Sequence, residues 1–183
     1  MVGFSSATVL TFDEFVDSNP YDTIYPEVYD GYGGLDWNNF NVIHEDRYTY
    51  ENGYQYANVS GTNSVFNYFD RTAVISNSTF DFNGAYFTSA WTSVNILTIT
   101  GSFNGSQLYS EQFRLSNTTA TWFDVNFFGV DELSFSTVGS HFAMDNFTYN
   151  ETAPVPEPAT VLLMGAGLLG LMGYNRKRFS KKS

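Results

Sequence analysis

The chain has 183 residues, with 8 lysines and arginines, 19 aspartates and glutamates and no cysteine, and its formal charge is −11. The missing cysteines exclude disulfide frameworks, cysteine-ligated zinc and thiol chemistry, and the net acidity argues against a nucleic-acid partner. Aromatic residues make up 19% of the chain and charged residues only 15%, so it can bury a core and is not a disordered acidic tail.

The charge is unevenly distributed along the chain. Residues 1–155 contain 18 acidic residues against three basic ones, Arg47, Arg71 and Arg114, and carry −15. Residues 156–183 contain one acid against five bases and carry +4. An acidic body of this kind attracts divalent cations and repels anionic polymers at low salt. Any polymer that it holds is therefore expected to be neutral or bridged by cations.

The N-terminal residues 1–7 end in Ser5-Ser6-Ala7, which fits the small-residue end of a secretory signal peptide. They lack the basic region and the apolar stretch that such a signal needs. We therefore expect residues 1–7 to be the remnant of a signal peptide whose true start lies upstream. The mature protein is expected to begin near Thr8.

The body from Thr8 to Asn150 alternates polar and apolar residues with a period of two, which is typical of half-buried strands. In one such run, Phe123, Val125 and Phe127 alternate with Asp124 and Asn126. No stretch of the body offers a convincing amphipathic helix. The predicted strands are residues 9–15, 94–103, 108–115, 122–127, 132–135 and 141–149.

Two Asn-Gly pairs predict hairpin turns, because a type I′ turn needs positive φ at both central positions. Asn104-Gly105 lies between two predicted strands, and Asn52-Gly53 lies between two tyrosine-rich runs, 48–50 and 54–56. Many short strands without an internal repeat predict an all-β fold, an antiparallel jelly-roll β-sandwich.

Acidic residues near the two ends of the body form a candidate metal site. Asp13 and Glu14 lie in the first predicted strand and Asp145, followed by Asn146, lies in the last. The terminal strands of jelly rolls commonly pair, and calcium accepts about six to eight oxygen ligands in irregular geometry. A structural calcium ion is therefore a candidate cofactor. The alternative is that these residues are solvated polar positions of alternating strands.

Four aromatic residues are candidates for sugar binding: Tyr32, Trp37, Tyr86 and Trp91. They lie near glycine, asparagine and aspartate in segments that resemble loops, where a ring can stack on a pyranose while amides bind hydroxyls. The alternative is core packing, because 18 phenylalanines, 13 tyrosines and 3 tryptophans must fill the interior. The phenylalanines are expected in the core.

Catalytic motifs are absent from the sequence. The two histidines, His44 and His141, have neither the HExxH spacing of a zinc protease nor a GxSxG serine motif beside them. With 18 acids in the body, some pair will lie close together by chance, so a glycosidase dyad does not follow from their number. We expect no enzyme, with a glycan-degrading enzyme as the alternative.

The segment Ala159 to Tyr174 runs for 16 residues without a charge or a proline. As a helix it would rise about 24 Å, a minimal span for a hydrocarbon core of roughly 30 Å. The bases that follow are expected to hold its end on the cytoplasmic side, which leaves the acidic body outside that membrane. The alternative is a buried core helix.

Three of the five prolines, Pro154, Pro156 and Pro158, precede this apolar segment and hold the backbone extended. The whole stretch VPEPATVLLMGAGLLGLMGYNRKR resembles the PEP-CTERM sorting signal of Gram-negative bacteria, which combines a Pro-Glu-Pro motif, a glycine-rich apolar helix and an Arg-rich tail. The resemblance implies that Pro156, Glu157 and Pro158 are the sorting motif. It also implies that Arg176, Lys177 and Arg178 are the cytoplasmic retention signal.

The same resemblance implies a processing partner and a location. Such proteins are substrates of an exosortase, a membrane-embedded protease, and are associated with extracellular polysaccharide in biofilm or floc matrix. The body is less specifically similar to the jelly-roll ectodomains that often precede this signal, a likeness carried by residues 34–40, 80–87 and 144–147.

These observations predict the following organisation: a signal-peptide remnant at 1–7, a β-sandwich ectodomain at 8–150, a linker with the PEP motif at 151–158, a transmembrane helix at 159–174 and a basic cytoplasmic tail at 175–183. The predicted role is a non-catalytic, polysaccharide-associated component of the cell surface or matrix that passes through the inner membrane. The alternative is a tail-anchored periplasmic protein that is never processed.

Overall fold

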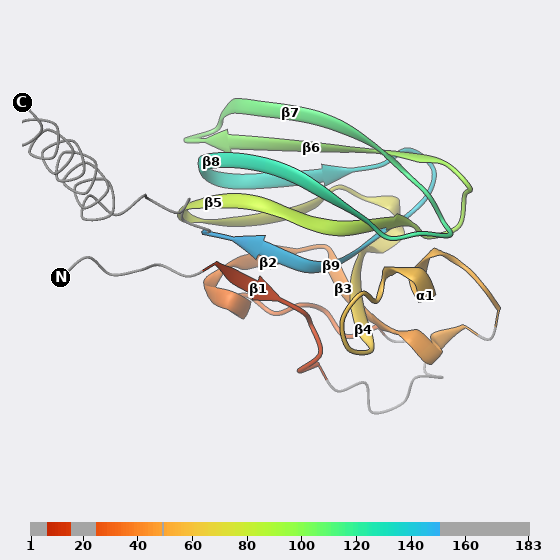
Figure 1. Ribbon diagram of the computed structural model, residues 1–183. Helices are drawn as coiled ribbons and strands as arrows, with labels where there is room; N and C mark the ends of the chain where they lie inside the picture. Colours follow the sequence, from red (N-terminus) through yellow and green to blue (C-terminus); the bar gives the residue numbers. More distant parts are fainter. Residues whose placement is uncertain (1–6, 16–24, 49, 151–183) are drawn as a thin grey trace, which may run out of the picture. The chain divides into compact units, whose positions relative to one another are not determined.

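The computed structural model describes residues 7–15, 25–48 and 50–150 (Figure 1). The chain divides into two units after Glu151, and the fold given below is that of the first unit. The predicted linker at 151–158, the transmembrane helix at 159–174, the basic tail at 175–183 and residues 1–6 of the signal-peptide remnant lie outside the described residues. Within the described ranges, no helix combines the length and the apolar character that a membrane span requires.

The body is an antiparallel all-β sandwich, which confirms this part of the predicted fold. Its strands run in the order β3-β4-β9-β5-β8-β6-β7, and β1 pairs with β9 and β2 with β5. As expected for the two ends of the body, the first and last strands pair, with Thr8 opposite Tyr149. The strands are β1 (Thr8–Leu10), β2 (Asp36–Asn38), β3 (Phe40–His44), β4 (Asn63–Asn67), β5 (Ala73–Ser89), β6 (Asn95–Phe103), β7 (Ser106–Leu115), β8 (Thr121–Ser136) and β9 (Phe142–Tyr149).

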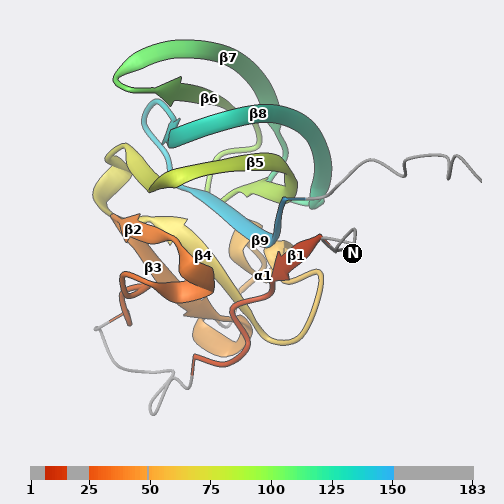
Figure 2. The ribbon, with the colours of Figure 1, turned by 90° about the vertical axis from the view of Figure 1, so that its left-hand side faces the viewer.

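Strand β5 joins the two layers of the sandwich. It pairs with β8 along most of its length and also with β2 and β9, with register shifts where the pairing changes. Figure 2 shows β6, β7 and β8 arching over one side of the molecule, with β1, β3, β4 and β9 on the other. The two predicted strands at 122–127 and 132–135 are one continuous strand, β8.

Phenylalanine dominates the core between the layers, as expected. Nine of the twelve largest fully buried side chains are phenylalanines, so the high aromatic content is used mainly for packing. The rings of Phe82 and Phe147 are stacked, with centroids 4.7 Å apart, and Phe40 contacts both Phe135 and Phe142. Aromatic pairs of this kind add about 0.5–1.5 kcal/mol to the energy of burial.

The two Asn-Gly pairs have different outcomes. Asn104 and Gly105 have φ of 50° and 72° and connect β6 to β7, which confirms the predicted hairpin. The hairpin predicted at Asn52-Gly53 is wrong, because Asn52 is the N-cap of a short helix, α1 (Gly53–Ala57), and its side chain accepts a hydrogen bond from the Tyr54 N–H. Gly53 is needed because a Cβ there would lie 1.7 Å from the Ser89 carbonyl oxygen.

Three 3₁₀ helices complete the described elements: η1 (Tyr32–Gly34), η2 (Glu45–Arg47) and η3 (Tyr68–Asp70). The first strand is shorter than predicted, since β1 ends at Leu10 and the buried Phe12 has φ of 62°. Asp13 and Glu14 therefore lie in a turn, which corrects their placement in a strand.

Candidate functional site

Asp13 and Asp145, two of the predicted calcium ligands, converge on one loop between α1 and β4. The Asp145 carboxylate accepts hydrogen bonds from the N–H groups of Val59 and Ser60, at 2.8 and 2.9 Å. The Asp13 carboxylate accepts from the N–H groups of Thr62 and Asn63, at 2.8 and 3.2 Å. The two carboxylates therefore fasten the loop from both sides.

Glycine is required where this loop passes Asp13. Gly61 has φ of 53°, and a Cβ there would lie 2.0 Å from an Asp13 carboxylate oxygen. Glu14, the third predicted ligand, is exposed and hydrogen-bonds the Tyr32 hydroxyl. A calcium ion would have to share the oxygens of Asp13 and Asp145 with these N–H donors. In the described part of the chain, no group of three or more histidine, cysteine, aspartate or glutamate side chains is placed to hold a metal ion. Calcium binding stays a prediction.

Asp145 is fully buried, and this burial raises its pKa to about 6 although its hydrogen bonds oppose the change. The cost of burying a charge exceeds the stabilisation that the N–H donors give to the ionised form. Asp145 therefore titrates in a mildly acidic range.

Two of the four predicted sugar-binding residues lie in the core. Tyr32 is 3% exposed and Trp37 is 5% exposed. The Trp37 indole N–H donates to the Tyr32 carbonyl at 2.9 Å, and its ring packs edge-on against Phe12, Phe40 and Phe147. Neither ring offers a face to solvent, which corrects the expectation of a surface platform at Tyr32 and Trp37.

Tyr86 is half-buried and lies beside a residue that the sequence reasoning did not select. It faces Trp122 across β5 and β8, with ring centroids 5.3 Å apart and planes at 62°. The Trp122 indole N–H donates to the Asp124 carboxylate at 2.6 Å, and its ring lies over Gly84, where a Cβ would be 2.8 Å away. No ring contact within the described ranges joins this pair to Trp91, so the four predicted aromatics do not form one surface.

Trp91 is half-exposed and belongs to a group of rings that we call the Tyr-Trp cluster, consisting of Tyr48, Tyr50, Tyr54 and Trp91. Trp91 and Tyr50 are 40% and 57% exposed, with ring centroids 6.5 Å apart and planes 32° apart. Tyr48 and the buried Tyr54 pack edge-on against Trp91, at 5.0 and 5.2 Å. The cluster therefore presents two aromatic faces to solvent on a packed base.

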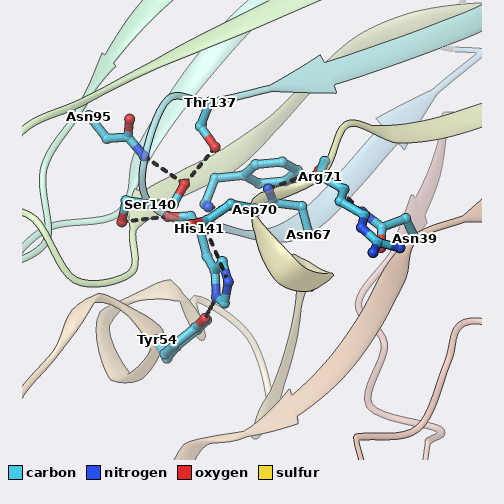
Figure 3. A network of polar contacts seen from close by, with 10 residues as sticks. Asn39, Tyr54, Asn67, Asp70, Arg71, Asn95, Thr137, Ser140 and His141 are labelled. Atoms are coloured by element: carbon cyan, nitrogen blue, oxygen red, sulfur yellow. Dashed lines mark hydrogen bonds and ion pairs between the residues drawn. The ribbon is translucent and has the colours of Figure 1, made fainter.

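Hydrogen bonds fix the base of the Tyr-Trp cluster (Figure 3). The Tyr54 hydroxyl donates to His141 Nδ1, and His141 Nε2 lies 3.2 Å from an Asp70 carboxylate oxygen. Burial lowers the pKa of His141, and the Asp70 carboxylate only partly opposes this change. The imidazole is therefore neutral near pH 7, donates through Nε2 to Asp70 and accepts from Tyr54 at Nδ1. Burial also raises the pKa of Tyr54 above its usual range, so its hydroxyl keeps its proton.

This hydrogen-bonded chain positions rings and has no open reacting group. Tyr54 is 3% exposed, so its hydroxyl is closed to a substrate. The exposed part of the site consists of Tyr50 and Trp91, which suit stacking on the apolar face of a sugar. Sequence reasoning selected Trp91 but missed its neighbours, because it assigned the tyrosines to a hairpin and looked at His141 only for catalytic spacing. No local sequence pattern indicates that Tyr54 hydrogen-bonds His141, which lies 87 residues further along the chain.

Comparison with protein families identifies the C-terminal segment. Residues 154–177 match the PEP-CTERM protein-sorting motif. The chain therefore carries the sorting signal that its sequence predicted, and this signal indicates an exported protein. No curated protein matches the chain.

Two solved structures are similar to the body at low identity. One is described as "Family 16 Carbohydrate Binding Module-2", with 15% identity, a TM-score of 0.37, and coverage of 63% of this chain and 90% of that one. The other is TmCBM61 in complex with β-1,4-galactotriose, with 9% identity, a TM-score of 0.35, and coverage of 64% and 88%. At these TM-scores, neither likeness says what this chain binds.

Proposed function

We propose that this protein is a non-catalytic component of the cell surface or extracellular matrix of a Gram-negative bacterium. Its jelly-roll ectodomain holds extracellular polysaccharide, and residues 159–174 cross the inner membrane until an exosortase recognises Pro156-Glu157-Pro158. The match of residues 154–177 to the sorting motif and the charge change from −15 to +4 support this route.

The mature C-terminus tests the sorting half of this proposal. Mass spectrometry of the exported protein is expected to show a chain that has lost the basic tail with Arg176, Lys177 and Arg178. Substituting Pro156, Glu157 and Pro158 with alanine should leave the tail in place and retain the protein in the inner membrane. An intact Lys181-Lys182-Ser183 end on exported material contradicts the proposal, and an intact end on membrane-bound wild type indicates the tail-anchored periplasmic alternative.

The observation that carries the binding half is the pair of exposed rings, Tyr50 and Trp91, on a hydrogen-bonded base. A loop that must present aromatic rings to a ligand needs such a base, because free rings would lose conformational entropy on binding. The acidic body repels anionic polymers at low salt, so we expect a neutral polysaccharide or one bridged by cations.

Trp91→Ala tests this binding directly. One stacked ring contributes about 1–2 kcal/mol, so retention on insoluble polysaccharide from the host matrix should fall about tenfold. Phe128→Ala is the matched control, because Phe128 is a 52% exposed ring on β8 outside the Tyr-Trp cluster. Equal retention of both variants and the wild type argues against the site. Release of reducing sugar by the wild type would contradict the non-catalytic role.

Calcium belongs to this proposal as a candidate cofactor at Asp13, Glu14 and Asp145. The convergence of Asp13 and Asp145 on one loop supports it, and their existing N–H donors oppose it. Calorimetric melting with calcium and with a chelator is the test. A bound ion is expected to raise the melting temperature, and an unchanged value counts against calcium.

A further inference from the structure

A pocket of about 460 Å³ opens beside η3, within the roughly 300–1,000 Å³ of small-molecule sites. Its lining includes Glu27, Trp37, Asn38, Phe69, Arg71 and Thr72. These residues come from three parts of the chain: the segment before η1, strand β2, and the η3 turn with the two residues after it. None of the four rings of the Tyr-Trp cluster lines it, so it is a separate place on the molecule.

The η3 turn is held in an unfavourable backbone conformation that exposes a ring. Phe69 and Asp70 have φ of 55° and 54°, in the left-handed region that side chains other than glycine rarely adopt. Phe69 is 64% exposed, which is the highest value among the described phenylalanines. Strained backbone that exposes a large apolar ring is typical of binding sites, where other contacts hold the strain in place.

Several hydrogen bonds hold this turn (Figure 3). The Asn39 amide donates to the carbonyls of Arg71 and Thr72, at 3.1 and 3.3 Å, and the Asn67 amide donates to the Arg71 carbonyl at 3.1 Å. Asp70 pairs with His141, the residue that also fixes Tyr54. The pocket wall is therefore fixed before any ligand arrives, which reduces the entropy lost on binding.

Two opposite charges line the pocket without neutralising each other. Glu27 and Arg71 are both exposed, and neither forms a salt bridge with any described residue. The Arg71 guanidinium lies over the Phe69 ring, 5.5 Å from its centroid. A ring, a guanidinium donor, a carboxylate acceptor and the Asn38 amide therefore surround one space.

We propose that this pocket binds one uncharged sugar residue of the polysaccharide, an inference that rests on the proposed function. Phe69 stacks on the apolar face of the pyranose, Arg71 and Asn38 donate to its oxygens, and Glu27 accepts from its hydroxyls. Glu27 offsets the charge of Arg71 at the pocket, and the −15 of the body disfavours a uronic acid, because its carboxylate would meet like charge. The pocket thus selects neutral sugars.

Binding of the full chain to an array of neutral and uronic-acid oligosaccharides tests this proposal. We expect neutral oligosaccharides to bind, with a loss of at least tenfold in Phe69→Gly and in Arg71→Gln. Glycine adopts φ of 55° freely, so Phe69→Gly removes the ring while keeping or raising the melting temperature. Phe128→Ala, which removes another exposed ring, should bind like the wild type.

The outcomes separate this proposal from the proposed function. If Phe69→Gly and Arg71→Gln bind sugar like the wild type and Trp91→Ala loses binding, the pocket proposal is overturned. The Tyr-Trp cluster is then the binding site. A preference for uronic-acid oligosaccharides also overturns the pocket. Absence of binding to any sugar by the wild type overturns both proposals.

Discussion

The two faces of strand β9 pack against different kinds of structure. On one face, Phe142, Met144 and Phe147 enter the aromatic core that also holds Trp37. On the other, Ala143 packs under the short helix α1, and Asp145 fastens the loop that follows it. One strand therefore stabilises the large aromatic core and a second, smaller apolar cluster that buried polar groups accompany.

The difference shows how each face contributes to stability. The core face depends on apolar burial, which does not change with pH. The α1 face depends both on a smaller apolar cluster and on hydrogen bonds to Asp145 and His141, whose charge states change in the acidic range. Because the Tyr-Trp cluster lies on the α1 face, binding is expected to respond to changes that leave the core intact.

The largest expected loss of stability comes from a substitution on the core face. Trp37→Ala removes a buried ring and its contacts with four other rings, and it should lower the free energy of unfolding by about 3–5 kcal/mol. Trp91→Ala, at a 40% exposed position with edge-on contacts to Tyr48 and Tyr54, should lower it by about 1–2 kcal/mol. Urea unfolding of both variants makes the comparison. Equal losses would show that the two tryptophans do not lie in such different environments.

Asp145→Asn tests the pH dependence of the α1 face. The folded pKa of about 6 lies above the unfolded value of 3.8, so the folded state holds an extra proton between these pH values. Asp145 therefore contributes stability below pH 3.8 that is lost as pH rises through about 6, up to about 3 kcal/mol in all. The difference in unfolding free energy between wild type and Asp145→Asn, measured from about pH 4 to 7, should follow this slope. A constant difference would contradict it.

The sequence predicts the core face better than the α1 face, because the core face follows from local patterns and the α1 face from contacts between residues far apart in the chain. Alternation predicted β6, β7 and β9, and the phenylalanine content predicted the core, because both signals are local or compositional. The α1 face was not predictable in this way: Asn52-Gly53 has the same local pattern as Asn104-Gly105. What differs is the tertiary setting: Gly53 lies against the backbone of Ser89, 36 positions away in the chain, where α1 packs on the sheet. Trp37 and Trp91 both lie among small or polar residues in the sequence, and it is tertiary packing that buries one and leaves the other half-exposed.

His141→Gln also tests the pH dependence of the α1 face, but here the stabilisation is lost as pH falls, whereas that of Asp145 is lost as pH rises. The folded pKa of His141 is lowered, so its contribution is complete above the unfolded value of 6.5 and is lost as pH falls below it. Near pH 7.5 the variant should lose about 1–3 kcal/mol, because the buried Tyr54 hydroxyl loses its acceptor. This loss should shrink as pH falls towards 5. A loss that grows on acidification would mean that His141 is charged in the folded protein.

The smallest expected loss of stability is at Asn52, whose side chain hydrogen-bonds both α1 and the backbone of the exposed Tyr50. Its side-chain oxygen caps α1 at Tyr54 N–H, at 2.9 Å, and its amide donates to the Tyr50 carbonyl at 3.1 Å. Asn52→Ala should lower the unfolding free energy by about 1 kcal/mol, whereas Asn52→Asp keeps the cap and should lose less.

The same pair of variants separates the helix cap from the position of Tyr50. Aspartate cannot donate to the Tyr50 carbonyl, so both variants should weaken retention on polysaccharide although only Asn52→Ala loses the cap. If Asn52→Asp binds like the wild type, the position of Tyr50 does not depend on this hydrogen bond. In that case α1 alone would fix the rings, and polysaccharide binding would follow the stability of the helix.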